Sequence, residues 1–257
     1  MKAITTVGEI YDFINEIAPF SLQQSYDNSG ICAGSRDMPV SRVLTSLDIT
    51  GAVADEAAEK GCELVLSHHP VIFRPLRVLS PENPAVKLAV RGIAALCMHT
   101  SYDSAEGGMN DLLAAKLGFS VAEVLDMDEG KPMGYVCTAG RSYTARELAE
   151  HCKAVLGCKV VRYTECEGST DRIGVCSGSG GSCLGAAAAK GCGALITGDV
   201  KHSDMVAAKD SGFCLIDAGH FSTEDIFHED IARRLKERFP GLEVSKAESF
   251  CDPVDVV

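Results

Sequence analysis

The sequence predicts an α/β protein. Amphipathic helical patterns alternate along the 257 residues with short apolar runs, which is typical of sheets covered by helices. With 46% hydrophobic and 23% charged residues, the composition is that of a globular protein. A chain of this length can form one large domain or two small ones.

The expected elements follow from local signals. The first helix should begin at Thr6, where Glu9 three positions on gives a capping-box spacing, and should end before Pro19. Strands are expected at 43–47, 64–67, 93–98, 133–139, 159–164, 172–176, 194–197, 213–217 and 242–245. Further helices are expected to begin near Gly107 and at Ser222.

Two stretches of the sequence resemble each other. Residues 41–69 align without a gap with residues 171–199, and both read as strand, glycine, alanine-rich helix, KGC and strand. The similarity indicates either a duplicated α/β unit or two alanine-rich helices of similar composition. If it is a duplication, the dipeptide Gly198-Asp199 stands in the second copy where the first has a pair of histidines.

Charge and composition limit the kinds of partner that the protein is expected to bind. A formal net charge of −12 disfavours a broad basic surface for nucleic acid or anionic lipid. No apolar run approaches the ~20 residues that a spanning helix needs, and acids occupy the N-terminal stretch where a signal peptide would be apolar. We therefore expect a cytoplasmic protein with no membrane partner. Its 12 cysteines are scattered without a C-x-x-C motif, so we expect them to be reduced and mostly buried.

Polar clusters follow three of the predicted strands. The clusters are His68-His69 after 64–67, His99 with Asp103 after 93–98, and His220 with Glu224 after 213–217. Ligands gather beyond the carboxyl ends of strands in open α/β sheets, so we expect the clusters to converge. Imidazole and carboxylate together suit Zn²⁺, Fe²⁺, Mn²⁺, Co²⁺ or Ni²⁺. Adjacent histidines on an extended backbone point to opposite sides, so the pair indicates two neighbouring metal ions bridged by a carboxylate.

Each of these residues also has a structural alternative. The paired imidazoles can hydrogen-bond to backbone carbonyls, and Asp103 can cap the helix expected near Gly107 or stabilise the SAEGG turn at 104–108. Glu224 would lie in the first turn of the helix expected from Ser222, where an acid stabilises the helix dipole. His99 suits a ligand or a residue that orients Asp103 equally well.

Other polar residues suggest substrate contacts. Arg74, Lys201 and His202 either bind an anion near the metals or are solvated surface charges. The glycine-rich stretch 177–182 is either an anion-binding nest or a tight turn, and the tight turn is favoured. The chain has no G-x-x-x-x-G-K-[ST] motif, which excludes a P-loop as the means of binding a triphosphate.

The motifs together resemble a known family. LSHHPVIF, HTSYDSAEGGMNDLLA, TGDVKH and IDAGHFSTED, in that order, are similar to the Nif-three-like dinuclear metal centre proteins, also described as GTP cyclohydrolase 1 type 2 homologues. The resemblance covers nearly the whole chain. It implies two related, intertwined α/β subdomains with three-layer α/β/α character, and a toroidal homohexamer. The expected divisions are 1–124, 125–216, and a segment 217–257 that returns to the first subdomain.

The resemblance also implies a ligand set of two divalent ions per chain. His68, Asp103 and Glu224 would hold one ion, and His69, His220 and Glu224 the other, with Glu224 bridging. Where the family has Trp-Asp-Asn, this chain has Tyr26-Asp27-Asn28 and no tryptophan anywhere. We expect these three residues to support the ligands or contact the substrate.

Three functions fit such a centre. The first is a metal-dependent hydrolase in which a water between two metals, assisted by Glu224 or acting alone, attacks carbon or phosphorus. The family name suggests a GTP cyclohydrolase-like reaction on a nucleotide or related small molecule. The second is a non-catalytic metal-binding or adaptor ring, and the third is redox or oxygen chemistry at a di-iron site.

Overall fold

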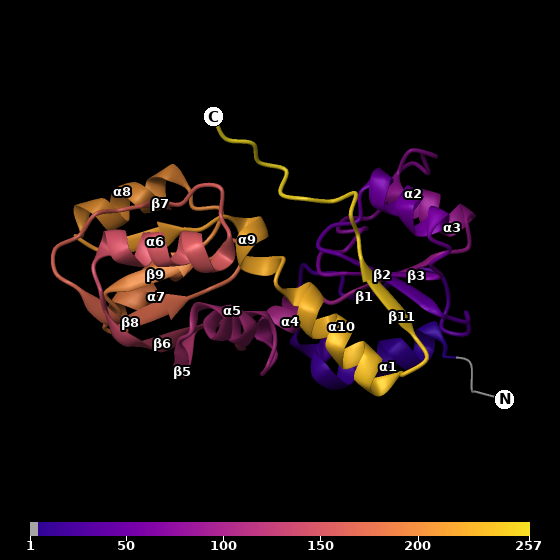
Figure 1. Cartoon of the computed structure of the whole chain (residues 1–257), viewed down its shortest axis with the longest axis horizontal. Helices are drawn as coiled ribbons and strands as arrows, with labels where there is room; N and C mark the ends of the chain where they lie inside the picture. The colour runs from indigo at the N-terminus through magenta and orange to yellow at the C-terminus, as the bar shows by residue number, and fades with distance from the viewer. Residues whose placement is uncertain (1–4) are drawn as a thin grey trace. The chain divides into compact units, whose positions relative to one another are not determined.

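The computed structural model describes residues 5–257, which divide into two compact units (Figure 1). The first unit comprises the chain up to Ala105 together with Phe227–Cys251. The second comprises Glu106–Ile226 and Asp252–Val257. The chain therefore leaves the first unit, builds the second, and returns, as expected of intertwined subdomains.

The first unit is built on a five-stranded sheet of order β1-β4-β3-β2-β11. The strands β11, β2, β3 and β4 are parallel, and β1 pairs antiparallel with β4. Its elements in chain order are α1 (Val7–Ile17), η1 (Phe20–Leu22), β1 (Gly30–Ala33), β2 (Arg42–Ser46), α2 (Gly51–Glu59), β3 (Leu64–Ser67), α3 (Pro84–Val90), β4 (Ala94–Cys97), α4 (Thr100–Ser104), α10 (Phe227–Arg238) and β11 (Glu243–Lys246).

The second unit is built on a six-stranded sheet of order β5-β6-β8-β9-β10-β7. The strands β8, β9 and β10 are parallel, and the remaining pairs are antiparallel. Its elements are α5 (Met109–Leu117), β5 (Ser120–Asp128), β6 (Lys131–Tyr143), α6 (Ala145–Leu156), β7 (Arg162–Tyr163), β8 (Thr170–Val175), η2 (Gly181–Cys183), α7 (Leu184–Ala189), β9 (Ala194–Thr197), α8 (His202–Asp210), β10 (Cys214–Asp217) and α9 (His220–Glu224).

Helices cover both faces of the second sheet. On β9, Ile196 packs in a buried cluster with Leu148 of α6, and its neighbour Leu195 packs in another with Ala187 of α7 and Ala208 of α8. Successive residues of a strand point to opposite faces of the sheet, so the apolar strand β9 contributes side chains to the hydrophobic clusters on both faces. The second unit is thus a three-layer α/β/α structure (Figure 1).

The local signals at the first helix are confirmed. The Thr6 side chain accepts a hydrogen bond from Glu9 N at 3.2 Å, and Glu9 accepts one from Thr6 N at 2.8 Å. This reciprocal pair is the capping box that the spacing predicted. The helix ends at Ile17, and Ala18 caps it before Pro19.

Most predicted strands are present, and the misses have local reasons. The run 159–164 forms only the two-residue edge strand β7. Two strands were not predicted: β1, which begins at Gly30, and β5. Glycine is uncommon in strands, and β5 is mostly exposed with three acidic residues, so neither has the apolar pattern of a buried strand.

The internal similarity corresponds to a repeated structure. The segments β2-α2-β3 and β8-α7-β9 share the order of elements and the parallel pairing. Val43 lies opposite Leu64 in the first sheet, and the aligned residues Ile173 and Ala194 lie opposite each other in the second. Chance similarity of two alanine-rich helices would not reproduce the strand register.

The division between the units lies elsewhere than the sequence suggested. The strand β5 pairs with β6 in the second sheet, so residues 106–124 belong to the second unit rather than the first. The helix α9 also belongs to the second unit, and the return to the first begins at Phe227 rather than at 217. Contacts between residues distant in the sequence set both boundaries, and local patterns do not reveal such contacts.

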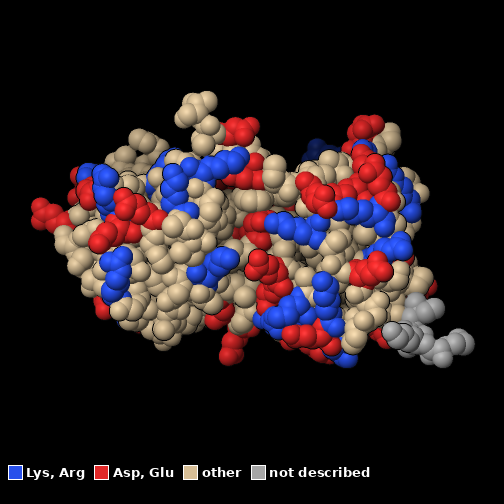
Figure 2. Space-filling model, viewed as in Figure 1, with Lys and Arg blue, Asp and Glu red and all other residues tan. Residues whose placement is uncertain are grey.

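Helix length and surface charge bear on whether the protein could bind a membrane or nucleic acid. No helix within residues 5–257 is long and apolar enough to cross a membrane. On the face shown in Figure 2, acidic and basic side chains are interspersed in small groups, without a continuous basic surface.

Candidate metal centre

The paired histidines follow β3, the middle strand of the first sheet. All four residues of β3 are buried, and Ser67 Oγ donates to the His69 carbonyl at 2.6 Å. The chain bends here, and the ring centroids of His68 and His69 lie 4.9 Å apart. The expectation that the two rings point to opposite sides was therefore wrong, because the backbone is no longer extended beyond Ser67.

A third imidazole joins the pair. The ring centroid of His99 lies 5.4 Å from that of His68 and 5.3 Å from that of His69. Each of the three residues offers a ring nitrogen within 4.8 Å of the others. These histidines come from the ends of neighbouring strands β3 and β4, as the expected convergence at the carboxyl edge requires.

Each histidine in this group is anchored through Nδ1. The partners are Met98 O at 3.0 Å for His68, Asp48 Oδ1 at 3.0 Å for His69 and Asp27 Oδ1 at 2.7 Å for His99. A carboxylate or carbonyl at Nδ1 fixes the tautomer in which Nε2 carries the lone pair for a metal. Asp48 was missed in the sequence, although it follows the predicted strand 43–47.

Asp27 is the anchor of His99. It also accepts hydrogen bonds from Thr100 Oγ1 at 2.6 Å and from Ser29 Oγ at 2.8 Å. Burial alone would raise the pKa of Asp27, but the hydrogen bonds from His99, Thr100 and Ser29 hold it well below its usual range. The Asp27 carboxylate therefore stays ionised, and it orients His99.

Asp103 lies on α4, with Oδ1 3.5 Å from His68 Nε2. It does not cap the next helix, because Gly108 is the N-cap of α5 and Asp111 accepts the hydrogen bond from Gly107 N at 2.9 Å. The capping alternative for Asp103 is wrong, and its carboxylate is directed to a candidate metal ligand.

The second unit holds its own histidine and carboxylate pair. His220 Nε2 lies 2.8 Å from Glu224 Oε2, one turn further along α9. His220 Nδ1 lies 2.8 Å from Asp199 Oδ2, so this histidine is anchored like those of the first unit. Glu224 is the last residue of α9, whereas the sequence placed it in the first turn of a helix from Ser222. An acid at this end gains nothing from the helix dipole, so the dipole does not explain Glu224.

Glycines make room for this pair. A Cβ on Gly178 would lie 2.2 Å from Glu224 Oε1, and a Cβ on Gly198 would lie 2.5 Å from His220 N. Gly198 aligns with His68, so the close approach of the α9 backbone explains why the second copy has no histidine there. Asp199, which aligns with His69, adopts a left-handed backbone conformation with φ 48°.

The glycine-rich stretch 177–182 is a tight turn. Its backbone N–H groups donate within the unit, from Gly178 to Thr223 Oγ1 at 3.1 Å and from Gly180 to Thr197 Oγ1 at 2.7 Å. These donors are directed to hydroxyls rather than to an anion. The turn brings Gly178 against Glu224.

The remaining predicted contacts lie further out. Arg74, Lys201 and His202 are exposed, as solvated charges would be. Tyr26 is 58% exposed and contacts Phe73, with ring centroids 6.4 Å apart. Phe73 in turn lies 6.1 Å from His99.

Asn28 ties the loop of Tyr26 to the chain after the paired histidines. Its side-chain amide donates to the Ile72 carbonyl at 2.7 Å. Of these three residues, Asp27 contacts His99 directly, whereas Tyr26 and Asn28 contact Phe73 and Ile72 in the neighbouring loop.

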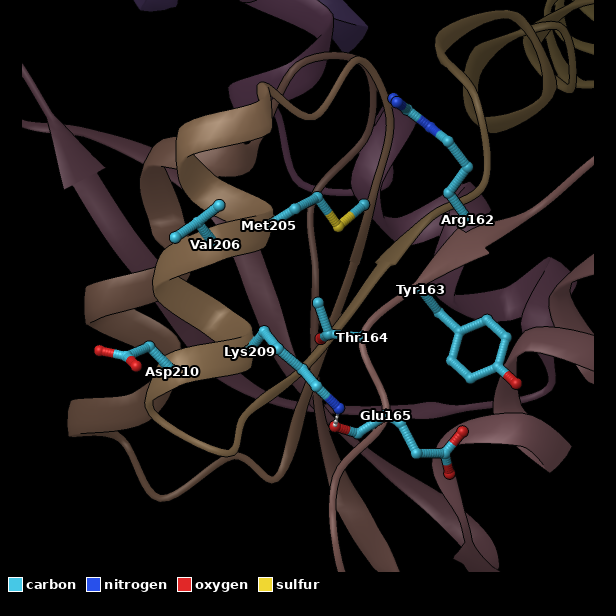
Figure 3. A pocket seen from close by; sticks show the side chains of 8 residues that line it. All are labelled: Arg162, Tyr163, Thr164, Glu165, Met205, Val206, Lys209 and Asp210. Atoms are coloured by element: carbon cyan, nitrogen blue, oxygen red, sulfur yellow. Dashed lines mark hydrogen bonds between the residues drawn. The ribbon is translucent and has the colours of Figure 1, made fainter.

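A separate pocket lies in the second unit, between β7 and α8 (Figure 3). Its volume is about 790 Å³, and Lys209 crosses it to donate to the Glu165 carbonyl at 3.2 Å. None of the candidate metal ligands lines this pocket. Arg162 at its margin pairs instead with Asp217, which also accepts a hydrogen bond from Gly219 N at 3.0 Å and so fixes the chain before His220.

Comparison with known proteins agrees with this architecture. The chain matches the family model described as Duf34/NIF3 (NGG1p interacting factor 3) over residues 5–253. It is 30% identical over 260 residues to the "GTP cyclohydrolase 1 type 2 homolog" of Clostridium perfringens, covering 98% of this chain and 99% of that protein. It is 32% identical over 256 residues to the "GTP cyclohydrolase 1 type 2" of Helicobacter pylori strain J99, with coverage of 98% and 99%.

Solved structures show the same fold. A Bacillus cereus protein related to NIF3 superposes with a TM-score of 0.90 at 21% identity, covering 100% of both chains. Reduced HcgD from Methanocaldococcus jannaschii superposes with a TM-score of 0.82 at 23% identity, covering 96% of this chain and 99% of that one. The family-model match over residues 5–253 and the relatives at 30% identity or more establish that the chain belongs to the Duf34/NIF3 family.

Proposed function

We propose that the protein is a dinuclear divalent-metal protein that acts as a metal-dependent hydrolase on a small molecule, with a nucleotide as the first candidate substrate. The observation that carries the proposal is the anchoring of His68, His69, His99 and His220 through Nδ1. Histidines with a purely structural role need not all adopt the same tautomer. A metal ligand, by contrast, needs a ring nitrogen with a free lone pair, and all four of these histidines present Nε2 in that way.

The donor chemistry of each unit fits a divalent metal. In the first unit, His68 is fully buried and lies beside Asp103. In the second, Glu224 is buried beside His220. Burying a carboxylate is costly unless a cation or hydrogen bonds compensate for it, and a metal ion would do so. We propose that His68, Asp103 and Glu224 hold one ion and His69, His220 and Glu224 the other.

The protein residues have distinct roles in this proposal. Two divalent ions, when bound, would supply a water acidified toward neutral pH and a positive charge that activates an electrophilic carbon or phosphorus. Asp48 and Asp199 would hold the imidazole rings of His69 and His220 in the orientation and tautomer that present Nε2 to a metal. Glu224 would offset the repulsion between the two cations and could accept a proton during attack.

Metal counting on three proteins tests the ligand set. We expect about two divalent ions per wild-type chain, the number found at two-metal sites. Glu224→Ala removes the proposed bridge, so nearly all the metal should be lost. His69→Ala removes one ligand from one ion, so occupancy should fall unequally. Elemental analysis of dialysed protein gives these numbers, and Glu229→Ala on the exposed face of α10 is the matched control. Full metal content in Glu224→Ala would refute the bridge.

Hydrolysis is tested separately from metal binding. Metal-loaded wild-type protein is incubated with GTP, and formate release is measured, with His69→Ala as the matched inactive variant. We expect turnover that depends on the metal and is lost in His69→Ala. If the protein binds two ions but hydrolyses no nucleotide, phosphoester or amide, the metal centre stands and the hydrolase proposal fails.

A further inference from the structure

Two cysteines of the first unit lie side by side on neighbouring strands. Cys32 is on β1 and Cys97 on β4, and their Sγ atoms are 3.8 Å apart. The strands are antiparallel with Gly30 opposite Cys97, and the register shifts between Ile31 and Ala33, where Cys32 lies. A register shift of this kind bends a strand locally and redirects its side chains, here toward Cys97.

The two thiols differ in exposure. Cys97 is only 1% exposed, whereas Cys32 is half-buried and accessible from solvent. The hydrogen bond with Cys97 lowers the pKa of the Cys32 thiol, although burial opposes this effect. Cys32 is therefore suited to attack an external reagent, and Cys97 is placed to react only with Cys32.

We propose that Cys32 and Cys97 form a thiol–disulfide exchange site that reacts with small-molecule disulfides. The Cys32 thiolate attacks one sulfur of the reagent RSSR, which forms a mixed disulfide and releases one RSH after protonation. Cys97 then attacks Cys32 Sγ and its proton passes to the departing RS⁻, so that the Cys32–Cys97 bond forms and the second RSH leaves. Both cysteines are oxidised and one RSSR is reduced to two thiols, so electrons and atoms balance.

The location of the pair links it to the candidate metal centre. Cys97 Sγ lies 3.2 Å from the Asn28 carbonyl, next to Asp27, the anchor of His99. Closing the Sγ atoms from 3.8 Å to the bonding distance of about 2 Å moves one or both thiols, and the Asn28 carbonyl lies near both, 3.2 Å from Cys97 Sγ and 3.8 Å from Cys32 Sγ. We expect oxidation to shift this loop and, through Asp27, to displace His99, which lies against the proposed ligands His68 and His69, and so to weaken metal binding. This consequence rests on the proposed function, whereas the exchange site does not.

Glutathione disulfide tests the exchange site on the whole chain. Reduced protein is incubated with the reagent, remaining thiols are alkylated, and the peptides are mapped by mass spectrometry. We carry Cys251→Ser in every protein because this exposed cysteine would itself react. Wild-type residues 32 and 97 should become joined to each other. Cys97→Ser should trap glutathione on Cys32, whereas Cys32→Ser should leave Cys97 unmodified.

The possible outcomes distinguish a thiol–disulfide exchange site from two cysteines that are close together but do not react with each other. A glutathione adduct that persists on Cys32 while Cys97 is present, or no reaction at Cys32, overturns the proposal. Circular dichroism of each variant establishes that the compared proteins are folded. Metal counting on oxidised and reduced protein tests the link to His99. If the disulfide forms and metal content is unchanged, the link fails and the exchange site stands; if even reduced protein binds no metal, the proposed function fails instead.

Discussion

At the residue scale, the candidate centre depends on glycines, which bind no metal themselves but leave space for the side chains that could. Gly178 has a left-handed backbone with φ +63°, and the space of its missing side chain is taken by Glu224 Oε1. Gly168, in an exposed loop of the same unit, has φ +80°, but a Cβ there would meet nothing within 4 Å. The two glycines share a left-handed backbone conformation, but Gly178 is buried against Glu224 whereas Gly168 is exposed.

We predict that Gly168→Ala loses ~1 kcal/mol of stability, because alanine is strained in the left-handed region, and that Gly178→Ala loses more, because its Cβ also collides with Glu224. Only Gly178→Ala should also displace Glu224 and reduce metal content. Thermal unfolding measures the first effect and elemental analysis the second. Equal metal content in both variants would mean that Glu224 does not need the space at Gly178.

At the element scale, one carboxylate fastens the returning C-terminal segment to α2. The side chain of Glu56 accepts hydrogen bonds from Ser249 N at 2.8 Å and Glu248 N at 3.0 Å, and it pairs with Lys60 Nζ at 2.6 Å. Burial alone would raise the pKa of Glu56, but these hydrogen bonds and those of Ser249 Oγ lower it to about 2. Because the segment follows β11, this clamp secures an edge of the first sheet.

The clamp predicts a pH-dependent stability. The folded-state pKa of about 2 lies below the ordinary value of 4.5, so the contribution is complete above pH 4.5 and is lost as the pH falls toward 2. Glu56→Gln should cost ~1.5–3 kcal/mol at pH 7, the range for hydrogen bonds to charged groups. The difference from wild type should shrink in urea unfolding at progressively lower pH. Glu59→Gln, exposed on the same helix, is the control; an equal effect of the two substitutions would contradict the clamp.

At the scale of the whole molecule, we predict that the protein assembles as the homohexamer that the family resemblance implies. Exposed apolar side chains follow the paired histidines, among them Phe73, Val78 and Leu79, the last two about three-quarters exposed. Several large exposed apolar side chains in one segment favour association. Sedimentation velocity with metal present should give the mass of six chains. A single-chain mass over a wide concentration range would exclude the hexamer.

Much of the fold was predictable because its signals are local. The capping box at Thr6 and the apolar runs of β3 and β9 depend on residues a few positions apart. The histidines and acids of the candidate centre were also recognisable, because they follow such runs. The strands β1 and β5 were not, since their residues gain strand structure from pairing with distant partners.

By itself, the sequence predicted the histidines and acids of the candidate centre, located most strands and the first helix, and revealed the similarity of two stretches without deciding whether it is a structural repeat. Only the tertiary structure decided which carboxylate anchors which imidazole, as Asp27 does for His99 and Asp199 for His220. It also decided that β5 and α9 belong to the second unit. The physical reason is that these contacts join loops at the ends of strands far apart in the chain, and sheet order and register bring such loops together.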